Sequence, residues 1–369
     1  MSALELYREK WREVPGGDDV DGRVFSDDLL GLPDDQFLAR WNSIAERRAA
    51  GVVGRMEPLY RDFFRGRKVL ELGGGLGFDG MRFAAQGARW TFADIVPGNL
   101  KVIRRVATLK GIAVECHLIG EDLSFDTLPP DYDAVVVIGS IHHVPFDIAR
   151  REAMNALSRL KVGGRWIELV YPRERWLREG SMPFCTWGTR TDGARTPWAE
   201  WHDIEKVRRR LHPAILKTVL DFELASNSHR WLDLQYAGMG RNIDPTIFID
   251  LVGQPVVLDG GRRNGWDFSG PKGAFHPIGR LDLRPLLANL NAPFAVDLIL
   301  HISEGIVGVG LLDINNQYLA DTEVILESTP DLRFVTLRCA EIPAFLVFRN
   351  RHENRGSSIA VRSAHLREA

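Results

Sequence analysis

Residues 69–77 read VLELGGGLG, an apolar strand that carries an acid, Glu71, near its end and runs into a glycine-rich turn. Residues 79–86, just beyond the turn, have a helical pattern. Glycine lets the backbone turn tightly and approach a ligand without interference from a Cβ atom. This stretch therefore predicts a strand, a ligand-binding turn and a helix, which together open an α/β domain.

Strands and helices continue to alternate after this turn. The sequence predicts strands at residues 68–72, 88–93, 114–119, 132–138 and 165–170, and helices at 79–86, 97–111 and 148–160. Residues 161–164, KVGG, are expected to turn the chain into the fifth strand, and residues 215–224 and 229–236 to add two closing strands. Regular alternation of this kind favours a parallel sheet with helices on both faces.

The length of 369 residues suggests about two domains. Residues 1–66 are expected to form a helical N-terminal cap, residues 67–243 the α/β domain and residues 244–369 a second domain. In this last part short apolar segments recur roughly every ten to twelve residues, the spacing of an all-β sandwich. Its predicted strands are residues 246–252, 275–283, 294–302, 306–312, 322–326, 333–337, 344–348 and 358–365.

Composition narrows the possible functions. The formal net charge is −2, whereas a protein that binds nucleic acid needs a basic face to neutralise phosphates. The three cysteines lie far apart and form no zinc-binding pattern, so we expect no metal and a reducing, cytoplasmic location. The apolar run at residues 134–138 is far shorter than a membrane span. A small molecule is the expected partner, and homo-oligomerisation through the C-terminal domain is left open.

The glycine-rich turn by itself allows two cofactors. Residues 75–80 literally satisfy G-x-G-x-x-G, the fingerprint of dinucleotide-binding enzymes. A dinucleotide places its pyrophosphate over this turn, where an ionised Glu71 would repel it. The same carboxylate would attract the ammonium group of S-adenosylmethionine, which has no phosphate. We therefore favour S-adenosylmethionine, and a nicotinamide-dependent oxidoreductase and a non-catalytic cofactor-binding scaffold are the alternatives.

Two further acids follow predicted strands. Asp94 ends the second strand, 19 residues after Gly75, where a carboxylate can bond both ribose hydroxyls of either cofactor. Asp122 follows the third strand, where a side chain can meet the adenine amino group. A surface role is the alternative for both residues.

Five motifs in order resemble those of the class I, Rossmann-like S-adenosylmethionine-dependent methyltransferases: ELGGGLG (71–77), FADI (92–95), ED (121–122), GSIHHV (139–144) and LKVGGR (160–165). The resemblance covers roughly residues 60–240 and implies a seven-stranded sheet. It also implies a cofactor site made of Glu71, Gly73, Gly75 and Gly77 at the methionine end, Asp94 at the ribose, Asp122 at the adenine, and Gly139 and Ser140 near the sulfonium, with Ile95 and Asn99 as further cofactor-binding residues.

The fourth predicted strand ends in Ile138, without the acid that many members of this family have there. The resemblance therefore implies no carboxylate base or metal at that place. His142 and His143 follow instead, at the carboxyl edge of the sheet where ligands bind. Histidine is suited to remove a proton from an acceptor near neutral pH, so both are candidate bases. The alternative is that the pair only packs near the cofactor or caps the next segment.

Residues 171–215 interrupt the alternation with a tryptophan-rich insert. The predicted acceptor wall consists of Tyr171, Arg175, Trp187, Asp192, Trp198, Glu200 and Trp201. Flat aromatic faces with nearby carboxylates suit a sugar or sugar-containing metabolite, and the histidine pair favours methyl transfer to oxygen. The alternative is a lid whose tryptophans form a small core of their own. The basic cluster at residues 206–210 is interpreted as a solvated helix face.

Overall fold

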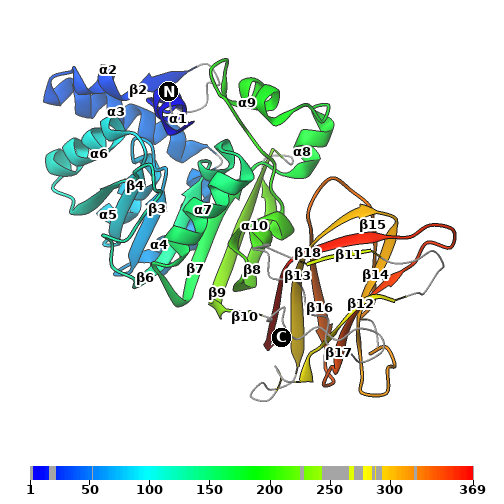
Figure 1. The fold of residues 1–369 in the computed structure, drawn as a ribbon. Helices are drawn as coiled ribbons and strands as arrows, with labels where there is room; N and C mark the ends of the chain where they lie inside the picture. Colours follow the sequence, from blue (N-terminus) through cyan, green and yellow to red (C-terminus); the bar gives the residue numbers. More distant parts are fainter. Residues whose placement is uncertain are drawn as a thin grey trace. The chain divides into compact units, whose positions relative to one another are not determined.

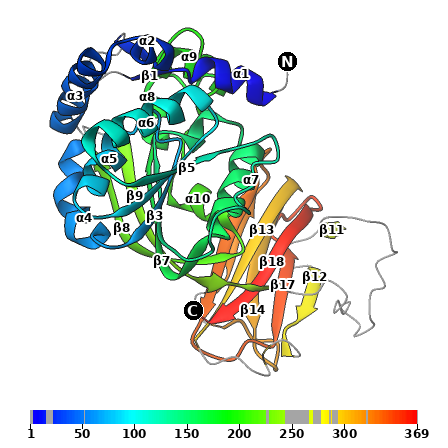
Figure 2. The same cartoon turned by 90° about the vertical axis from the view of Figure 1, so that its left-hand side faces the viewer.

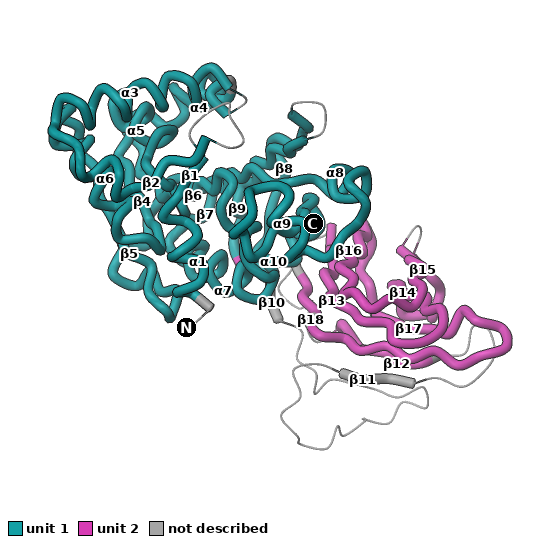
Figure 3. The backbone as a smooth tube through the Cα atoms, turned by 90° about the horizontal axis from the view of Figure 1, so that it is seen from above, with its two compact units in different colours: residues 1–238 teal, residues 239–369 magenta. Residues whose placement is uncertain are grey.

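The computed structural model describes residues 3–15, 22–51, 53–224, 228–242, 266–269, 277–284, 287, 293–319 and 322–368. The chain forms two compact units, Met1–Gly238 and Met239–Ala369 (Figure 3). Each unit has a hydrophobic core of its own. Among the described residues no helix is long and apolar enough to cross a membrane.

The first unit contains both helices and strands. Its helical elements are α1 (Ala3–Lys10), α2 (Ser26–Leu30), α3 (Asp34–Ala50), η1 (Gly54–Met56), α4 (Glu57–Phe64), α5 (Phe78–Ala85), α6 (Pro97–Lys110), η2 (Ile141–His143), α7 (Phe146–Leu157), α8 (Arg173–Arg178), α9 (Phe184–Asp192) and α10 (Ile204–Leu211). Its strands are β1 (Glu13–Pro15), β2 (Arg23–Phe25), β3 (Lys68–Leu72), β4 (Arg89–Asp94), β5 (Val114–Leu118), β6 (Tyr132–Ile138), β7 (Leu160–Val170), β8 (Ala214–Leu224) and β9 (His229–Met239).

Seven of these strands form one sheet in the order β5-β4-β3-β6-β7-β9-β8 (Figure 1). Neighbouring strands from β5 to β7 pair in parallel, and β9 pairs antiparallel with β7. The order reverses at β3, which lies between β4 and β6, and ligands bind beyond the carboxyl ends of strands at such a point. The predicted Rossmann-like seven-stranded sheet is confirmed.

Helices cover both faces of this sheet (Figure 2). On β3, Val69 packs in a cluster with side chains of α3 to α6, whereas Leu70 packs in a second cluster with α7 and α10. Successive side chains of a strand point to opposite faces, so a strand covered on both sides is apolar at nearly every position. This burial explains the continuous apolar run of β6.

Several local predictions differ from the structure. Residues 161–164 were expected to form a turn but belong to β7. The strand is irregular there, since the β6–β7 register shifts between Tyr132 and Ala134, and Gly163 allows this with a φ of +85°. Helix α7 begins at Phe146, directly after Pro145, and ends at Leu157, so the predicted helix was placed too late. In the N-terminal part, where a helical cap was expected, β1 pairs antiparallel with β2.

The interpretation of residues 206–210 as a solvated helix face is wrong for two of them. Lys206 and Arg210 are buried on α10. Lys206 forms an ion pair with Glu200 at 2.6 Å, and Arg210 forms one with Glu168. The density of charge along the sequence suggested a solvated face, whereas Glu200 and Glu168, which both lie outside α10, compensate these cations inside the unit.

The named elements of the second unit are all strands in the part that the structure describes. Its strands are β10 (Arg241–Asn242), β11 (Trp266–Ser269), β12 (Pro277–Asp282), β13 (Phe294–Glu304), β14 (Ile306–Leu312), β15 (Val324–Glu327), β16 (Arg333–Cys339), β17 (Phe345–Asn350) and β18 (Ser358–Glu368). They form two antiparallel sheets, and apolar side chains of both sheets share one core. The predicted all-β sandwich is confirmed, β10 and β11 were not predicted, and the predicted strand at 246–252 lies outside the described residues.

Candidate active site

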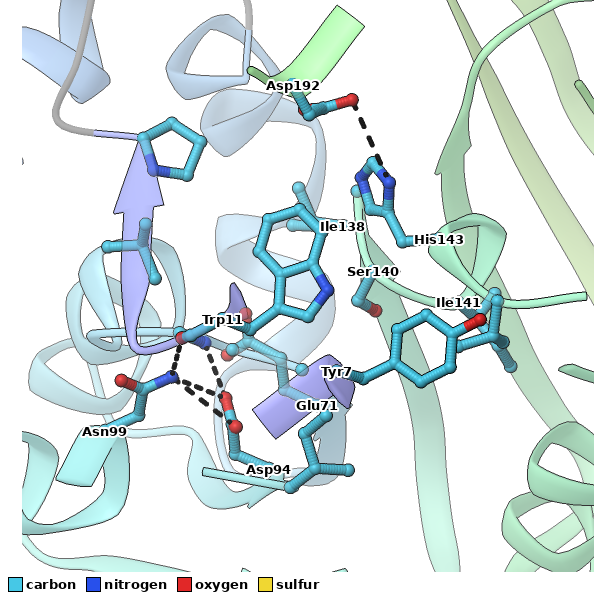
Figure 4. A pocket seen from close by; sticks show the side chains of 18 of the residues that line it. Tyr7, Trp11, Glu71, Asp94, Asn99, Ile138, Ser140, Ile141, His143 and Asp192 are labelled. Atoms are coloured by element: carbon cyan, nitrogen blue, oxygen red, sulfur yellow. Dashed lines mark hydrogen bonds and ion pairs between the residues drawn. The ribbon is translucent and has the colours of Figure 1, made fainter. Parts of the chain in front are cut away.

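A cavity of about 420 Å³ lies at the carboxyl ends of β3, β4, β6 and β7 (Figure 4). Gly73, Ile95, Gly139 and Tyr171, which directly follow these strands, all line it. The strand order reverses here, and the volume falls in the range of about 300–1,000 Å³ that is usual for small-molecule sites. The cavity is therefore the candidate ligand site.

The glycine-rich turn brings main chain against this cavity. Gly73 and Gly75 line it with φ values of +64° and +55°. A Cβ atom on Gly73 would lie 2.4 Å from the Cβ atom of Ser140, whose hydroxyl donates to the carbonyl oxygen of Leu72 at 2.7 Å. Glycine is thus required at position 73 both by its dihedral angle and by the close approach of the loop after β6. Gly139 and Ser140, in that loop, also line the cavity.

Glu71 lines the cavity although its side chain is only 2% exposed. The indole N–H of Trp90 donates to its Oε2 at 2.7 Å. Burial, followed by the nearby charge of Asp79, raises the pKa of Glu71 to about 8. The carboxylate expected from the sequence is therefore a strongly desolvated group, and an ammonium group beside it would lower its pKa.

The third glycine of the dinucleotide fingerprint has a packing role in this chain. A Cβ atom on Gly80 would lie 2.2 Å from Oε2 of Glu71 and 2.3 Å from Nε1 of Trp90. Gly80 thus leaves room for the hydrogen bond between these two side chains. The packing of Glu71 and Trp90 therefore explains the third glycine of the G-x-G-x-x-G match, and no bound pyrophosphate is needed to explain it.

Arg48, on α3, places a positive charge beside these acids. Its Nε and Nη2 atoms lie 2.7 and 2.6 Å from Oδ2 of Asp79, and Arg48, Asp79 and Glu71 all line the cavity. One cation next to two acids complements a zwitterion, whose carboxylate would face the guanidinium and whose ammonium would face the acids. The α-amino acid end of S-adenosylmethionine fits this arrangement.

Asp94 is buried at the end of β4. Its carboxylate accepts hydrogen bonds from the main-chain N–H groups of Gly75 at 3.1 Å and Val96 at 2.7 Å, and from Nδ2 of Asn99 at 3.4 Å (Figure 4). Burial raises the pKa of Asp94 to about 6, against these hydrogen bonds. Oδ1 of Asn99 is buried and has no hydrogen-bond partner among the described residues. The carboxylate of Asp94, which lines the cavity, is an acceptor that suits the hydroxyl donors of a ribose.

His143 follows β6 and lines the cavity beside an acid from the insert. Its Nδ1 atom lies 3.3 Å from the carbonyl oxygen of Trp198 and 3.8 Å from Oδ2 of Asp192. The hydroxyl of Tyr171 donates to the same carboxylate at 3.1 Å. Burial lowers the pKa of His143, and Asp192 opposes that effect. The imidazole is thus neutral at pH 7, with its proton assigned to Nδ1 by these acceptors and a lone pair on Nε2.

His142 does not line the cavity. Its ring packs 4.3 Å from the ring of His143 and 4.5 Å from that of Tyr171, between centroids. Neither ring nitrogen has a hydrogen-bond partner in the described part of the chain, and burial lowers the pKa of His142 strongly. Of the two histidines that the sequence could not separate, only His143 faces the space where an acceptor would bind.

Most of the predicted acceptor wall lies behind the cavity. Tyr171 and Asp192 line it, whereas the structure does not bring the remaining five residues there: Arg175, Trp187, Trp198, Glu200 and Trp201. Trp187 is fully buried in a cluster with Tyr171, against which Trp201 packs. These tryptophans belong to the small core that was the alternative interpretation of the insert.

The polar members of the predicted wall have partners within the insert or near it. Arg175 stacks 4.4 Å above the ring of Tyr171 and forms an ion pair with Glu179 at 2.9 Å. Trp198 donates through Nε1 to Glu200 at 3.1 Å. Their chemistry supports the position of Tyr171 and of the loop around it.

Two residues of the predicted cofactor site also stay outside the cavity lining. Gly77, with φ +77°, precedes α5, and a Cβ atom there would lie 2.9 Å from Cγ1 of Ile103. Asp122 bends back onto its own loop, where Oδ1 accepts from the N–H of Ser124 at 3.2 Å. Its neighbours in sequence, Glu121 and Leu123, line the cavity instead.

Residues 3–15, which we call the N-terminal strap, form a wall of the cavity that the sequence did not indicate. Tyr7, Trp11 and Val14 line it (Figure 4). Arg8 fixes the strap by donating to the carbonyl oxygens of Ile95 at 3.0 Å and Ile119 at 3.2 Å. Tyr7 and Trp11 share one face of a helical pattern, which signals packing but not the surface against which they pack.

Other lining residues that sequence reasoning missed are Arg23, Arg48, Asp79, Arg151, Glu152 and His229. They come from segments that converge only in the folded chain. Among the described residues, no group of His, Cys, Asp and Glu side chains is arranged to hold a metal ion.

A family model described as a methyltransferase domain matches residues 70–166. A ubiquinone biosynthesis O-methyltransferase of Idiomarina loihiensis is 31% identical over 145 residues, which cover 36% of this chain and 58% of that protein. A protein of the same name from Xylella fastidiosa is 37% identical over 101 residues, covering 27% of this chain and 40% of that protein. The chain thus spans about half the length of the curated relatives that it matches.

Among solved structures, an O-methyltransferase family 2 protein of Planctomyces limnophilus in complex with apigenin is similar with a TM-score of 0.40 and 20% identity, covering 53% of this chain and 60% of that one. The family match is more informative, because it spans β3 to the middle of β7 and includes the glycine-rich turn and the histidine pair. The strand order and the position of the cavity agree with it. The first unit of this chain is therefore a methyltransferase domain of the class I, Rossmann-like, S-adenosylmethionine-dependent family.

Proposed function

We propose that the chain transfers the methyl group of S-adenosylmethionine to a hydroxyl oxygen of a small-molecule acceptor, with His143 as the general base. The observation that supports this most is the row formed by Tyr171, Asp192 and His143 at the cavity wall. A base whose second nitrogen is oriented by a carboxylate is a recurring arrangement for removing a proton from a hydroxyl.

Bound S-adenosylmethionine supplies an electrophilic methyl group on its sulfonium. Arg48, Asp79 and Glu71 would hold the amino acid end, and Asp94 with Asn99 the ribose. Gly139 and Ser140 also line the cavity. The side that carries Trp11, His143 and Tyr171 is left for the acceptor.

His143 would receive the acceptor proton on Nε2, because Nδ1 faces the carbonyl oxygen of Trp198 and the carboxylate of Asp192. The imidazolium so formed is stabilised by that carboxylate, which the hydroxyl of Tyr171 holds in place. Burial lowers the pKa of His143, so the base is unprotonated throughout the neutral range. The rate is expected to fall only at acid pH, where the imidazole becomes protonated before it meets the acceptor.

A hydroxylated ring is the acceptor that this side of the cavity suits. Trp11 offers a flat face whose centroid lies 4.5 Å from that of His143, and Val14 and Pro15 add apolar surface. The sequence favoured a sugar as the acceptor. Trp11 and Asp192, which line the cavity, still support a sugar, whereas the tryptophans behind the cavity do not. A phenol is the second candidate, supported by the apolar surface and by the name of the curated relatives, ubiquinone biosynthesis O-methyltransferases.

The test is a methyl-transfer assay of the full chain with isotopically labelled S-adenosylmethionine, against one panel of sugars and one of phenols. With the acceptor so found, His143→Gln is expected to lower kcat by about 10²- to 10⁴-fold while the affinity for S-adenosylhomocysteine stays unchanged. The matched control is His117→Gln, since His117 lies on β5 and faces the carbonyl oxygen of Ser124, not the cavity.

Full kcat in His143→Gln at every pH between 6 and 9 would show that His143 is not the base. Failure of S-adenosylhomocysteine to bind would remove the proposal altogether. Stabilisation by a nicotinamide dinucleotide in its place would revive the oxidoreductase alternative.

A further inference from the structure

Besides Asp94, the loop that follows β5 and helix α7 contribute to one end of the cavity lining. Ile95, Leu123 and Ile148 give this end apolar walls, and Glu152 lines it together with Ile148 from one face of α7. In the proposed function the ribose is held at Asp94. The flat base attached to that ribose would then enter the apolar slot.

The acid that the family resemblance places at the base is engaged elsewhere. Asp122 is exposed and accepts from the N–H of Ser124 at 3.2 Å, and the following residue, Leu123, has φ +55° and is buried. This conformation brings the apolar Leu123 to the cavity and keeps the carboxylate of Asp122 out of it. The neighbouring acid, Glu121, has a side chain that is 59% exposed and forms an ion pair with Arg8 at 3.5 Å.

Glu152 is the acid that remains at this end of the cavity. It is partly buried, and its carboxyl group makes no hydrogen bond or ion pair with any described residue. Burial raises the pKa of Glu152 to about 7; the more distant charge of Arg210 opposes the shift and that of Asp94 adds to it. A carboxyl group in such surroundings costs free energy unless a donor reaches it.

The adenine of the cofactor offers such a donor in its C6 amino group. We propose that Glu152, and not Asp122, accepts the hydrogen bond from the C6 amino group of adenine and thereby selects the base of the cofactor. The inference rests on the proposed function, because it takes the ribose to lie at Asp94. In its protonated form the same carboxyl group can also donate to N1 of the ring, so both protonation states suit adenine.

The experiment is isothermal titration of the full chain with S-adenosylhomocysteine and with its 6-deamino analogue, which lacks only the amino group. The wild-type chain is expected to prefer S-adenosylhomocysteine by about 10-fold or more. Glu152→Met, which removes the acceptor but fills the slot, is expected to bind both compounds within about 2-fold of each other. Glu152→Gln keeps one acceptor oxygen and is expected to retain part of the preference. Asp122→Asn is the control and is expected to leave the preference unchanged.

A full preference in Glu152→Met, or a preference lost in Asp122→Asn, would overturn the inference. If the wild-type chain binds neither compound, the proposed function and the inference fail together. Wild-type binding of S-adenosylhomocysteine without any effect of Glu152→Met or Glu152→Gln would overturn the inference alone. Thermal melting of each variant verifies that it is folded.

Discussion

The two sides of the cavity differ in how the chain builds them. The cofactor side comes largely from one continuous stretch, residues 71–99, in which a strand, a glycine-rich turn, a helix and a second strand place acids and glycines together. The acceptor side comes from segments far apart in sequence, including Trp11, His143, Tyr171 and Asp192. The residues of the cofactor side depend on one another, because a single local motif places them. On the acceptor side, one segment can change in sequence without altering the others, which suits a fold that serves many acceptors.

The largest effect on cofactor affinity is expected at the most tightly packed position of the glycine-rich turn. Gly73→Ala places a Cβ atom 2.4 Å from the Cβ atom of Ser140 at a φ of +64°, so the turn and the facing loop must move apart. We expect the affinity for S-adenosylhomocysteine to fall about 10- to 100-fold by titration calorimetry. Gly111→Ala is the matched control, because Gly111 has φ +65° with nothing within 4 Å of the added atom. Equal losses in the two variants would mean that backbone strain, not the site, explains the effect.

A smaller effect, confined to the acceptor side, is expected for Asp192→Asn. The carboxylate orients His143 and stabilises its protonated form, so kcat should fall about 10-fold or more with little change in cofactor affinity. Because Asp192 raises the pKa of His143, its removal should also move the acid limb of the kcat profile to lower pH. The measurement is the pH–rate profile of both proteins. A shift to higher pH would contradict the assigned electrostatics.

The N-terminal strap connects the two sides, and loosening it should affect both modestly. Arg8→Ala removes two hydrogen bonds to the carbonyl oxygens of Ile95 and Ile119. We expect cofactor affinity to fall about 3- to 10-fold and the acceptor KM to rise. Arg12→Ala is the control, because Arg12 is exposed and its ion-pair partners among the described residues are Glu9 and Asp27. An unchanged Arg8→Ala would show that the strap is not part of the binding site.

The smallest signal is a proton count. The pKa of Glu71 is raised to about 8 from its ordinary value of 4.5, so this carboxyl is mostly protonated at pH 7 and an ammonium group beside it would displace the proton. Titration with S-adenosylhomocysteine in buffers of different ionisation enthalpy should show release of about 0.5 to 1 proton, which Glu71→Gln removes. Because the folded chain keeps this proton up to a higher pH than the unfolded chain, the contribution of Glu71 should lower the free energy of unfolding progressively as pH rises from about 4.5 to 8. Identical proton counts in both proteins would contradict this assignment.

The cofactor side could be predicted from sequence because its signals are local. The period of the strands, the glycines of the turn and the acid at the end of β4 lie within a short stretch, and each has a direct physical consequence. The acceptor side could not be predicted, because burial of Trp187 or exposure of Trp11 depends on which segments meet in space. His142 and His143 have the same immediate neighbourhood in sequence, and only the fold determines which ring faces the cavity. Charge was misleading at Lys206 and Arg210, whose compensating acids are Glu200 and Glu168.

The central claim is that the carboxyl ends of β3 and β4 hold S-adenosylmethionine. Its most direct test is calorimetric titration of the wild-type chain and of Asp94→Ala with S-adenosylhomocysteine and, separately, with NAD. We predict saturable one-to-one binding of S-adenosylhomocysteine to the wild type, at least about 10-fold weaker binding to Asp94→Ala, and no binding of NAD. Equal affinity of S-adenosylhomocysteine for the two proteins, or binding of NAD in its place, would contradict the account.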